Sequence, residues 1–256
     1  MNTEPLVRLQ RSDGIALISL NRPARHNALV PELLAALLRA LAHPHSQDAR
    51  AVILRAEGRS FSTGGDLVGF RDHLDSIGAY AHGLVGQLNA AILAIYTHPA
   101  PVICAVQGQV TGGSLGLLLA ADHVIMHRAA TITPWYSVVG FSPDGGWTAL
   151  LPGIIGRRQA MNWLADNSSH DADTCLALGL VHQVVGDDCD AAALRWAQRG
   201  AEKDAGSVAL ARRLLNADCN TVRQRLESER EYFVSQIQTQ AALDGIDLFL
   251  RRREHV

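Results

Sequence analysis

Two loops of the chain each carry a pair of adjacent glycines, Gly64-Gly65 and Gly112-Gly113, directly before a helical pattern. Glycine lets the backbone adopt positive φ and lets a ligand approach the main-chain N–H groups closely. A helix that begins near Gly113 also directs its unpaired N–H groups and the positive end of its dipole out of the turn. If the two loops converge, they can bind a developing negative oxygen, which is the chemistry of an oxyanion hole. The spacing alone equally fits two ordinary turns.

A second motif overlaps the later loop, because residues 112–116 (GGSLG) fit the G-x-S-x-G pattern of a serine nucleophile elbow centred on Ser114. Asp144 or Asp173, followed by His182, would supply triad partners in the chain order of α/β-hydrolases. Against this, five residues separate the preceding strand from the first glycine, and no HGGG-like segment lies upstream. Ser114 is therefore interpreted as a small residue at a helix start.

Strands that alternate with helices must position these loops, which predicts an α/β fold with crossover connections. Asp13-Gly14 suits the tight turn of an N-terminal hairpin. Apolar periodicity predicts strands at residues 6–10, 15–20, 51–54, 101–106, 124–126 and 181–185. Helices are expected from Pro31, through residues 85–95 and over 114–121, and the tail from about residue 206 is expected to be helical throughout.

Composition excludes several classes of function. A formal net charge of −2 gives no reason to expect nucleic-acid binding. The apolar runs are too short to span a bilayer, and the first 14 residues lack a signal-peptide pattern, which together predict a cytoplasmic protein without membrane segments. The cysteines show no metal-like pairing, so reduced thiols and no metal are expected at Cys104, Cys175, Cys189 and Cys219.

Four segments, in order, resemble the crotonase (enoyl-CoA hydratase/isomerase) superfamily over roughly residues 5–250. Residues 21–29 (NRPARHNAL) are similar to the NRP…NAL stretch of that family, and residues 61–67 (FSTGGDL) to its FxxGxDL loop. Residues 105–122 are similar to its AVNG…GGG…LA..D segment, and residues 139–146 (VGFSPDGG) to GLxPDGG. Each motif is weak alone, but four at the family's spacing are specific.

The resemblance implies a crotonase-like ββα spiral over residues 1–200 and a helical region at 201–256 that supports a homotrimer or hexamer. It implies an acyl-CoA substrate, with coenzyme A present only as part of the substrate thioester and no separate cofactor. By this resemblance the oxyanion N–H groups would be those of Gly65 and Gly113, and Asp144 would be the candidate acid/base. An apolar wall, for which the flanking Trp135, Tyr136 and Trp147 are candidates, would raise the pKa of Asp144. The positions expected to hold the coenzyme A portion are Arg25, His26, Thr63, Gly64, Asp66, Leu67 and Tyr136.

The chain departs from the family where hydratases carry two glutamates, because the matching positions are Gly116 and Tyr136. The position matching the base of the similar aroyl-CoA dehalogenases is Asn89. The preferred hypothesis is therefore an enoyl-CoA isomerase that uses the oxyanion hole and Asp144. An atypical hydratase, an acyl-CoA thioester hydrolase and a catalytically silent acyl-CoA-binding protein stay open as alternatives.

Overall fold

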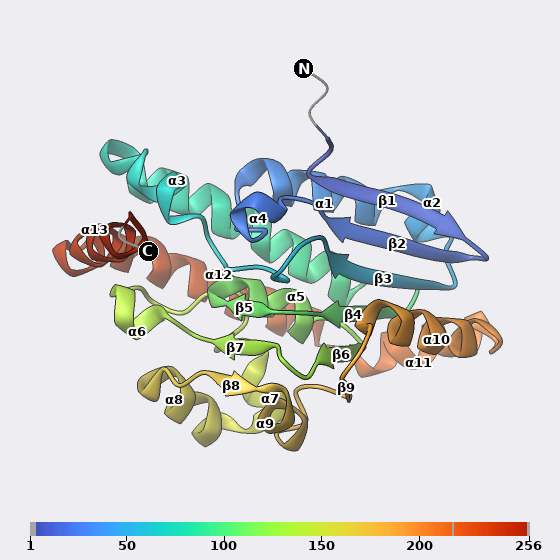
Figure 1. The fold of residues 1–256 in the computed structure, drawn as a ribbon. Helices are drawn as coiled ribbons and strands as arrows, with labels where there is room; N and C mark the ends of the chain where they lie inside the picture. The colour runs from blue at the N-terminus through green and yellow to red at the C-terminus, as the bar shows by residue number, and fades with distance from the viewer. Residues whose placement is uncertain (1–3, 217, 255–256) are drawn as a thin grey trace.

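The computed structural model describes residues 4–216 and 218–254, and its core is a six-stranded sheet in the order β1-β2-β3-β4-β6-β9 (Figure 1). β1 and β2 are antiparallel, joined by Asp13 and Gly14, which both adopt positive φ, and every later pair is parallel. The strands are β1 (Val7–Ser12), β2 (Ile15–Leu20), β3 (Ala51–Ala56), β4 (Val102–Val106), β6 (His123–His127) and β9 (Gln183–Val185). The expected α/β alternation is confirmed.

A second sheet of three very short strands was not located by the sequence patterns. It comprises β5 (Gln109–Thr111), β7 (Thr131–Thr133) and β8 (His170–Asp171), in that order. Isolated bridges join Ser62 to Val110 and Leu29 to Gly65, which extend the edge of this sheet into the glycine loops. Strands of two or three residues are too short to show the period-two alternation that predicts a strand.

Helices cover both faces of the large sheet, because successive strand side chains point to opposite faces. Val52 and Leu54 of β3 face the main core, whereas Ile53 packs with the alanines of α10. The helices before the tail are α1 (Pro31–Ala42), α2 (Pro44–Gln47), α3 (Leu67–Arg71), α4 (Ile77–Tyr96), α5 (Leu115–Leu119), α6 (Tyr136–Val139), α7 (Leu151–Ile155), α8 (Arg157–Asp166), α9 (Ala172–Ala177) and α10 (Cys189–Ala201), with 3₁₀ turns η1 (Pro23–Arg25), η2 (Leu74–Ser76) and η3 (Gly112–Ser114).

The tail is helical as expected, with α11 (Ala205–Leu215), α12 (Cys219–Ile237) and α13 (Gln240–Glu254). α12 packs along α4, and α13 lies beside α3 and α6 at one end of the molecule (Figure 1). Most of the apolar tail side chains join the main core of their own chain, namely Leu226, Phe233, Ile237, Ile246 and Leu250. These side chains close the core of their own chain, whereas the exposed leucines of the tail are Leu210, Leu214 and Leu215 on α11 and Leu248 on α13. The homotrimer or hexamer and the boundary at residue 200 stay predictions.

Among the described residues, no helix is long and apolar enough to cross a bilayer.

Candidate active site

A cavity of about 520 Å³ lies where the two glycine loops meet. Its lining combines main chain from Gly64, Gly65, Gly112 and Gly113 with apolar side chains of α3, α4, α12 and α13. Asp144 and Asp66 are the two carboxylates among the described lining residues. The cavity therefore joins backbone donors, a carboxylate and an apolar enclosure in one place.

In the first glycine loop, a hydrogen bond to the Gly64 carbonyl fixes the orientation of the Gly64–Gly65 peptide unit and therefore of the Gly65 N–H. The Leu29 N–H donates to the Gly64 carbonyl at 2.7 Å, and the Asp66 N–H donates to the Leu29 carbonyl at 3.0 Å. In a planar trans peptide the carbonyl and the following N–H point in opposite directions, so the Gly65 N–H must point away from Leu29. Among the described residues no acceptor binds that N–H.

Gly64 must be glycine for a steric reason. Its φ is +71°, and a Cβ atom there would stand 2.7 Å from the Thr111 carbonyl oxygen of the second loop. A side chain would therefore force the two loops apart.

In the second loop, the carbonyl before the second glycine is also fixed by a hydrogen bond, here from a side chain. The Trp147 Nε1–H donates to the Gly112 carbonyl at 2.8 Å, so the Gly113 N–H of the same peptide unit points the opposite way. Gly113 lies in the first turn of η3, where backbone N–H groups have no helical acceptor. The expected pair of donors is thus held with both N–H groups available to a ligand.

We expect Trp147→Phe to lower kcat about tenfold for the acyl-CoA reaction expected from the sequence. The substitution keeps a ring in the core but removes the N–H group that orients the Gly113 peptide. Trp163→Phe is the matched control, since the Trp163 ring is also buried and contacts Trp147 but its Nε1–H donates to the Ser168 carbonyl. The measurement is steady-state kinetics of both folded variants. Equal kcat for the two variants would show that the indole hydrogen bond does not serve the donor.

Asp144 lies directly against the second donor. A Cβ atom built on Gly113 would stand 2.8 Å from Oδ1 and 3.0 Å from Oδ2 of Asp144. The Tyr136 hydroxyl donates to Oδ1 at 2.6 Å, which leaves Oδ2 for a substrate proton. Burial, opposed by the Tyr136 hydrogen bond and reinforced by the charge of Glu229, raises the pKa of Asp144 to about 7. A carboxyl with such a pKa can both take and return a proton near neutral pH.

Tyr136 is fixed as a donor by its own surroundings. Burial and the adjacent Asp144 charge raise the pKa of the Tyr136 phenol well above its ordinary value, so it stays protonated. The preceding residue, Trp135, adopts the left-handed region with φ of 67°, which is unusual for a bulky side chain. The Trp135 N–H donates to Asn167 Oδ1 at 2.7 Å, and this contact holds the turn that places Tyr136.

Glu229 is the site residue that the sequence patterns missed. It is buried on α12, where its carboxylate accepts from the N–H groups of Gly146, Thr148 and Ala149 at 2.7–2.9 Å and from the Thr148 hydroxyl at 2.7 Å. These donors directly follow Asp144 in the chain, so Glu229 fixes the turn that carries the acid. No local motif marks it, because its partners are about 80 residues away.

The raised pKa of Asp144 predicts that the acid costs the protein stability. The folded protein keeps a proton that the unfolded chain releases near pH 4, so stability falls as pH rises from about 4 to about 7, and the full penalty is present above 7. Asp144→Asn removes this penalty and should raise the unfolding free energy by about 2–4 kcal/mol at pH 8 while changing it little at pH 4. Thermal melts of both proteins at pH 4 and pH 8 measure this, and identical melting temperatures at pH 8 would contradict it.

One hydratase position, Gly116, and the dehalogenase-base position, Asn89, both lie outside the cavity. A Cβ atom on Gly116 would stand 2.3 Å from the Gly145 carbonyl oxygen and 2.4 Å from Ile92 Cδ1. Asn89 directs its amide Nδ2 to the Leu226 carbonyl on α12 at 2.9 Å. Neither residue lines the cavity, so neither supplies a base there.

The serine-hydrolase alternative is wrong. Ser114 is fully buried, and its hydroxyl donates to the Ser62 and Thr111 carbonyls at 3.0 Å and 2.7 Å. His182 instead accepts from the Val124 N–H at 3.0 Å and packs its ring against His123. Asp173 is exposed and pairs with Arg128.

The residues expected to hold coenzyme A divide into two groups. Thr63, Gly64, Asp66, Leu67 and Tyr136 line the cavity, whereas Arg25 and His26 lie in the adjoining loop. Asp66 caps α3 and lies 2.8 Å and 3.1 Å from the guanidinium groups of Arg22 and Arg25. Burial alone would raise the pKa of Asp66, but the two arginines outweigh it and hold that pKa below its usual range. Asp66 is therefore ionised, and it joins the start of α3 to the loop of Arg22 and Arg25.

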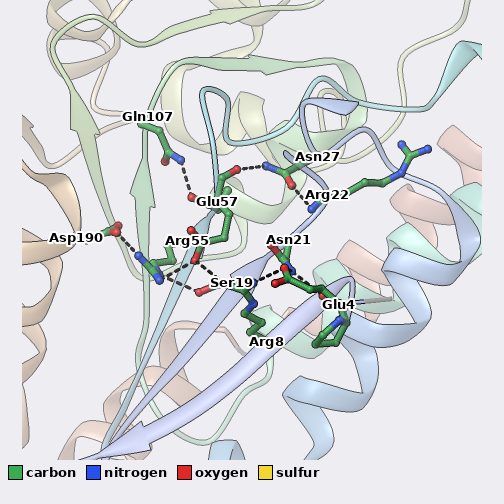
Figure 2. A network of polar contacts seen from close by, with 12 residues as sticks. Glu4, Arg8, Ser19, Asn21, Arg22, Asn27, Arg55, Glu57, Gln107 and Asp190 are labelled. Atoms are coloured by element: carbon green, nitrogen blue, oxygen red, sulfur yellow. Dashed lines mark hydrogen bonds and ion pairs between the residues drawn. The ribbon is translucent and has the colours of Figure 1, made fainter. Parts of the chain in front are cut away.

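The loop that carries Arg22 and Arg25 is anchored to the sheet by a polar network (Figure 2). The Asn27 amide donates to the Glu57 and Ser60 carbonyls at 2.9 Å, and its Oδ1 accepts from the Arg22 N–H. Farther along, Arg55 on β3 joins Glu57, Ser19 and Asp190 of α10. The buried amide fixes the loop's path past the cavity.

A sequence model described as "Enoyl-CoA hydratase/isomerase" matches residues 10–256. The chain belongs to the enoyl-CoA hydratase/isomerase family. It is 32% identical over 247 residues to 1,2-epoxyphenylacetyl-CoA isomerase of Escherichia coli (strain K12), covering 94% of this chain and 93% of that one. It is 33% identical over 192 residues to 4-chlorobenzoyl coenzyme A dehalogenase-2 of Arthrobacter sp, covering 72% and 67% of the two chains.

The fold of this family member also matches solved structures. The crystal structure of enoyl-CoA hydratase from Bacillus halodurans superimposes with a TM-score of 0.89 at 24% identity, over 95% of this chain and 99% of that one. The expected crotonase-like fold is confirmed. Among the described residues of this enoyl-CoA hydratase/isomerase family member, no group of three His, Cys, Asp or Glu side chains is placed to hold a metal ion.

Proposed function

We propose that this family member is an enoyl-CoA isomerase in which Asp144 moves a proton along the acyl chain. The observation that carries the proposal is one buried carboxylate against Gly113, with its pKa raised to about 7 and one oxygen held by Tyr136. Asp66, the other described acid of the cavity, is neutralised by two arginines. Asp144 is therefore the acid best suited to exchange a proton with a bound substrate.

The reaction needs two proton transfers and no added atom. The thioester oxygen of a 3-enoyl-CoA accepts hydrogen bonds from the Gly65 and Gly113 N–H groups, which stabilise the enolate oxygen as charge develops. The Asp144 carboxylate takes a proton from C2, and the electron pair of that C–H bond spreads over a dienolate. The protonated Asp144 then gives the proton to C4, which leaves a double bond between C2 and C3. One carboxylate close to both carbons serves both transfers.

Hydration requires more than this arrangement supplies. A water must be positioned and activated beside the double bond, and the position of one hydratase glutamate is closed by the Gly145 carbonyl. The other is the tyrosine that holds Asp144. Three alternatives, an atypical hydratase, a thioester hydrolase and a catalytically silent binder, are each distinguished from the isomerase by the product assay described below.

The 33% identity to a protein named 4-chlorobenzoyl coenzyme A dehalogenase favours a second candidate, dehalogenation with Asp144 as nucleophile. One observation weighs against it: the residue at the position of the dehalogenase base, Asn89, directs its amide to the Leu226 carbonyl and lies outside the cavity. Release of chloride from 4-chlorobenzoyl-CoA would favour this candidate.

The test supplies purified protein with a 3-enoyl-CoA and, separately, with a 2-enoyl-CoA, and follows the products by mass spectrometry. Interconversion of the two without 3-hydroxyacyl-CoA or free coenzyme A supports the isomerase. Robust 3-hydroxyacyl-CoA identifies a hydratase, and free coenzyme A identifies a hydrolase. Binding without turnover of any thioester identifies the silent binder.

A further inference from the structure

Three phenylalanines from separate elements pack together at the cavity wall. Phe70 of α3, Phe141 after α6 and Phe233 of α12 have ring centroids 5.4–6.0 Å apart. All three line the cavity, together with Leu84, Val85 and Leu88 of α4. We name Phe70, Phe141 and Phe233 the aromatic box.

The box lies on the side of the oxyanion donors where the acyl chain must go. A Cβ atom built on Gly65 would stand 3.0 Å from the Phe70 ring and 3.8 Å from Leu84, and one on Gly113 would stand 2.8 Å from Leu88. Asp144 is on this same side, against Gly113. An acyl chain whose reacting carbons reach Asp144 therefore continues along Leu88 and Leu84 toward Phe70.

The cavity lining is polar in a different region. Most of its hydroxyl and amide groups come from the second sheet and the segment before β8, among them Thr111, Thr133 and Asn167, and Thr63 and Tyr136 add hydroxyls from the loops. The described lining residues of α3, α4 and α12 are all apolar, so a hydroxyl or carboxylate buried among them would lack a hydrogen-bond partner, which costs free energy. An aromatic ring, by contrast, gains from edge-to-face contacts with neighbouring rings in addition to the burial of its apolar area.

We propose that the acyl group of the substrate ends in an apolar aromatic ring, which the box of Phe70, Phe141 and Phe233 receives. This inference rests on the proposed isomerase function for the position of the reacting carbons. It assigns substrate choice to α3, α12 and the segment after α6, and bond migration to Asp144 and the donors.

The experiment compares three 3-enoyl thioesters that share the same reacting segment: hex-3-enoyl-CoA, 6-phenylhex-3-enoyl-CoA and the ω-carboxylate hex-3-enedioyl-CoA. The phenyl substrate is expected to show about tenfold higher kcat/KM than hex-3-enoyl-CoA, as one or two ring contacts would give. The carboxylate substrate should fall at least tenfold below hex-3-enoyl-CoA. Equal values for the phenyl and plain substrates, or a preference for the carboxylate, would overturn the inference.

Phe141→Ala provides the specific variant, because Phe141 is part-buried and lies outside the donors and the acid. It should lower kcat/KM for 6-phenylhex-3-enoyl-CoA more than kcat/KM for hex-3-enoyl-CoA, so that most of the phenyl advantage is lost. Tyr232→Ala is the matched control, since Tyr232 is 70% exposed beside Phe233 and should change neither substrate. An unchanged phenyl advantage in Phe141→Ala would contradict the assignment.

Binding separates this inference from the reaction. Calorimetry with the saturated analogues 6-phenylhexanoyl-CoA, hexanoyl-CoA and adipoyl-CoA should rank their affinities in that order, whether or not any double bond moves. Isomerisation of hex-3-enoyl-CoA without this ranking would leave the proposed function intact and refute the aromatic acyl group. This affinity ranking without isomerisation would refute the proposed isomerase function and leave the aromatic acyl group supported.

Discussion

Asp144→Asn is expected to lower kcat for double-bond migration by about 10²–10⁴-fold, because asparagine keeps the size and the acceptor for Tyr136 but cannot carry a proton. In the wild type, Asp144 must be ionised to take the C2 proton, so kcat/KM should rise with pH through about 7 and then level off. The variant should lose this pH dependence together with the rate. The measurements are turnover of a 3-enoyl-CoA across pH 5–9 and exchange of substrate C–H in heavy water.

The same variant supplies its own folding control, since it should be more stable than the wild type at pH 8. A folded Asp144→Asn protein that still exchanges substrate protons at the normal rate would show that another group is the base. Loss of both stability and activity would instead indicate that the aspartate is needed for the turn.

Glu229→Ala is expected to lower the free energy of unfolding by about 3–5 kcal/mol, because three buried or part-buried backbone N–H groups lose their shared acceptor. Glu229→Gln keeps the shape of the side chain but turns one acceptor oxygen into an NH₂ donor that faces N–H groups. It is therefore expected to lower the free energy of unfolding by less than Glu229→Ala does. It also removes the negative charge that raises the pKa of Asp144, so the pH profile of kcat/KM should move to lower pH. A purely structural glutamate would not move that profile.

Glu227→Gln is the matched control, because Glu227 lies two residues earlier on α12, is 44% exposed and pairs with Arg230. An exposed pair of this kind contributes about 0–1 kcal/mol, so this variant should melt and titrate like the wild type. Thermal unfolding and pH-rate profiles of the three variants decide the point. A Glu229→Gln profile that overlays the Glu227→Gln profile would contradict electrostatic coupling to Asp144.

The sequence predicted the elements whose signals are local. The Asp13-Gly14 hairpin, the buried strands and the amphipathic α1 each show their pattern within a dozen residues, and the structure confirms them. The strands β5, β7 and β8 carry too few residues to show any pattern, although β5 directs the chain into Gly113. They form by pairing with one another across long stretches of chain, which is a tertiary effect.

The site residues likewise divide into those marked by a local sequence signal and those whose role depends on tertiary packing. Glycines, an Asp-Gly turn and a family resemblance indicated Gly65, Gly113 and Asp144. Trp147 was expected only as an apolar wall, because the destination of its indole N–H depends on a fold that brings Gly112 to it. Glu229 carries no motif, and its role exists only because α12 packs against the turn after Asp144.

The two N–H groups proposed to bind the thioester oxygen are oriented through the Gly64 and Gly112 carbonyls, which accept hydrogen bonds from the Leu29 N–H and the Trp147 indole N–H. The side chains of the aromatic box make neither of these hydrogen bonds. Phe70 stands against Gly65, whereas Phe141 and Phe233 are not among the atoms nearest to either glycine. Exchange of Phe141 or Phe233 is therefore expected to change which acyl group fits while the proposed oxyanion donors keep their positions. New thioester substrates would then be accessible through a few side chains, without any change to the backbone of the glycine loops.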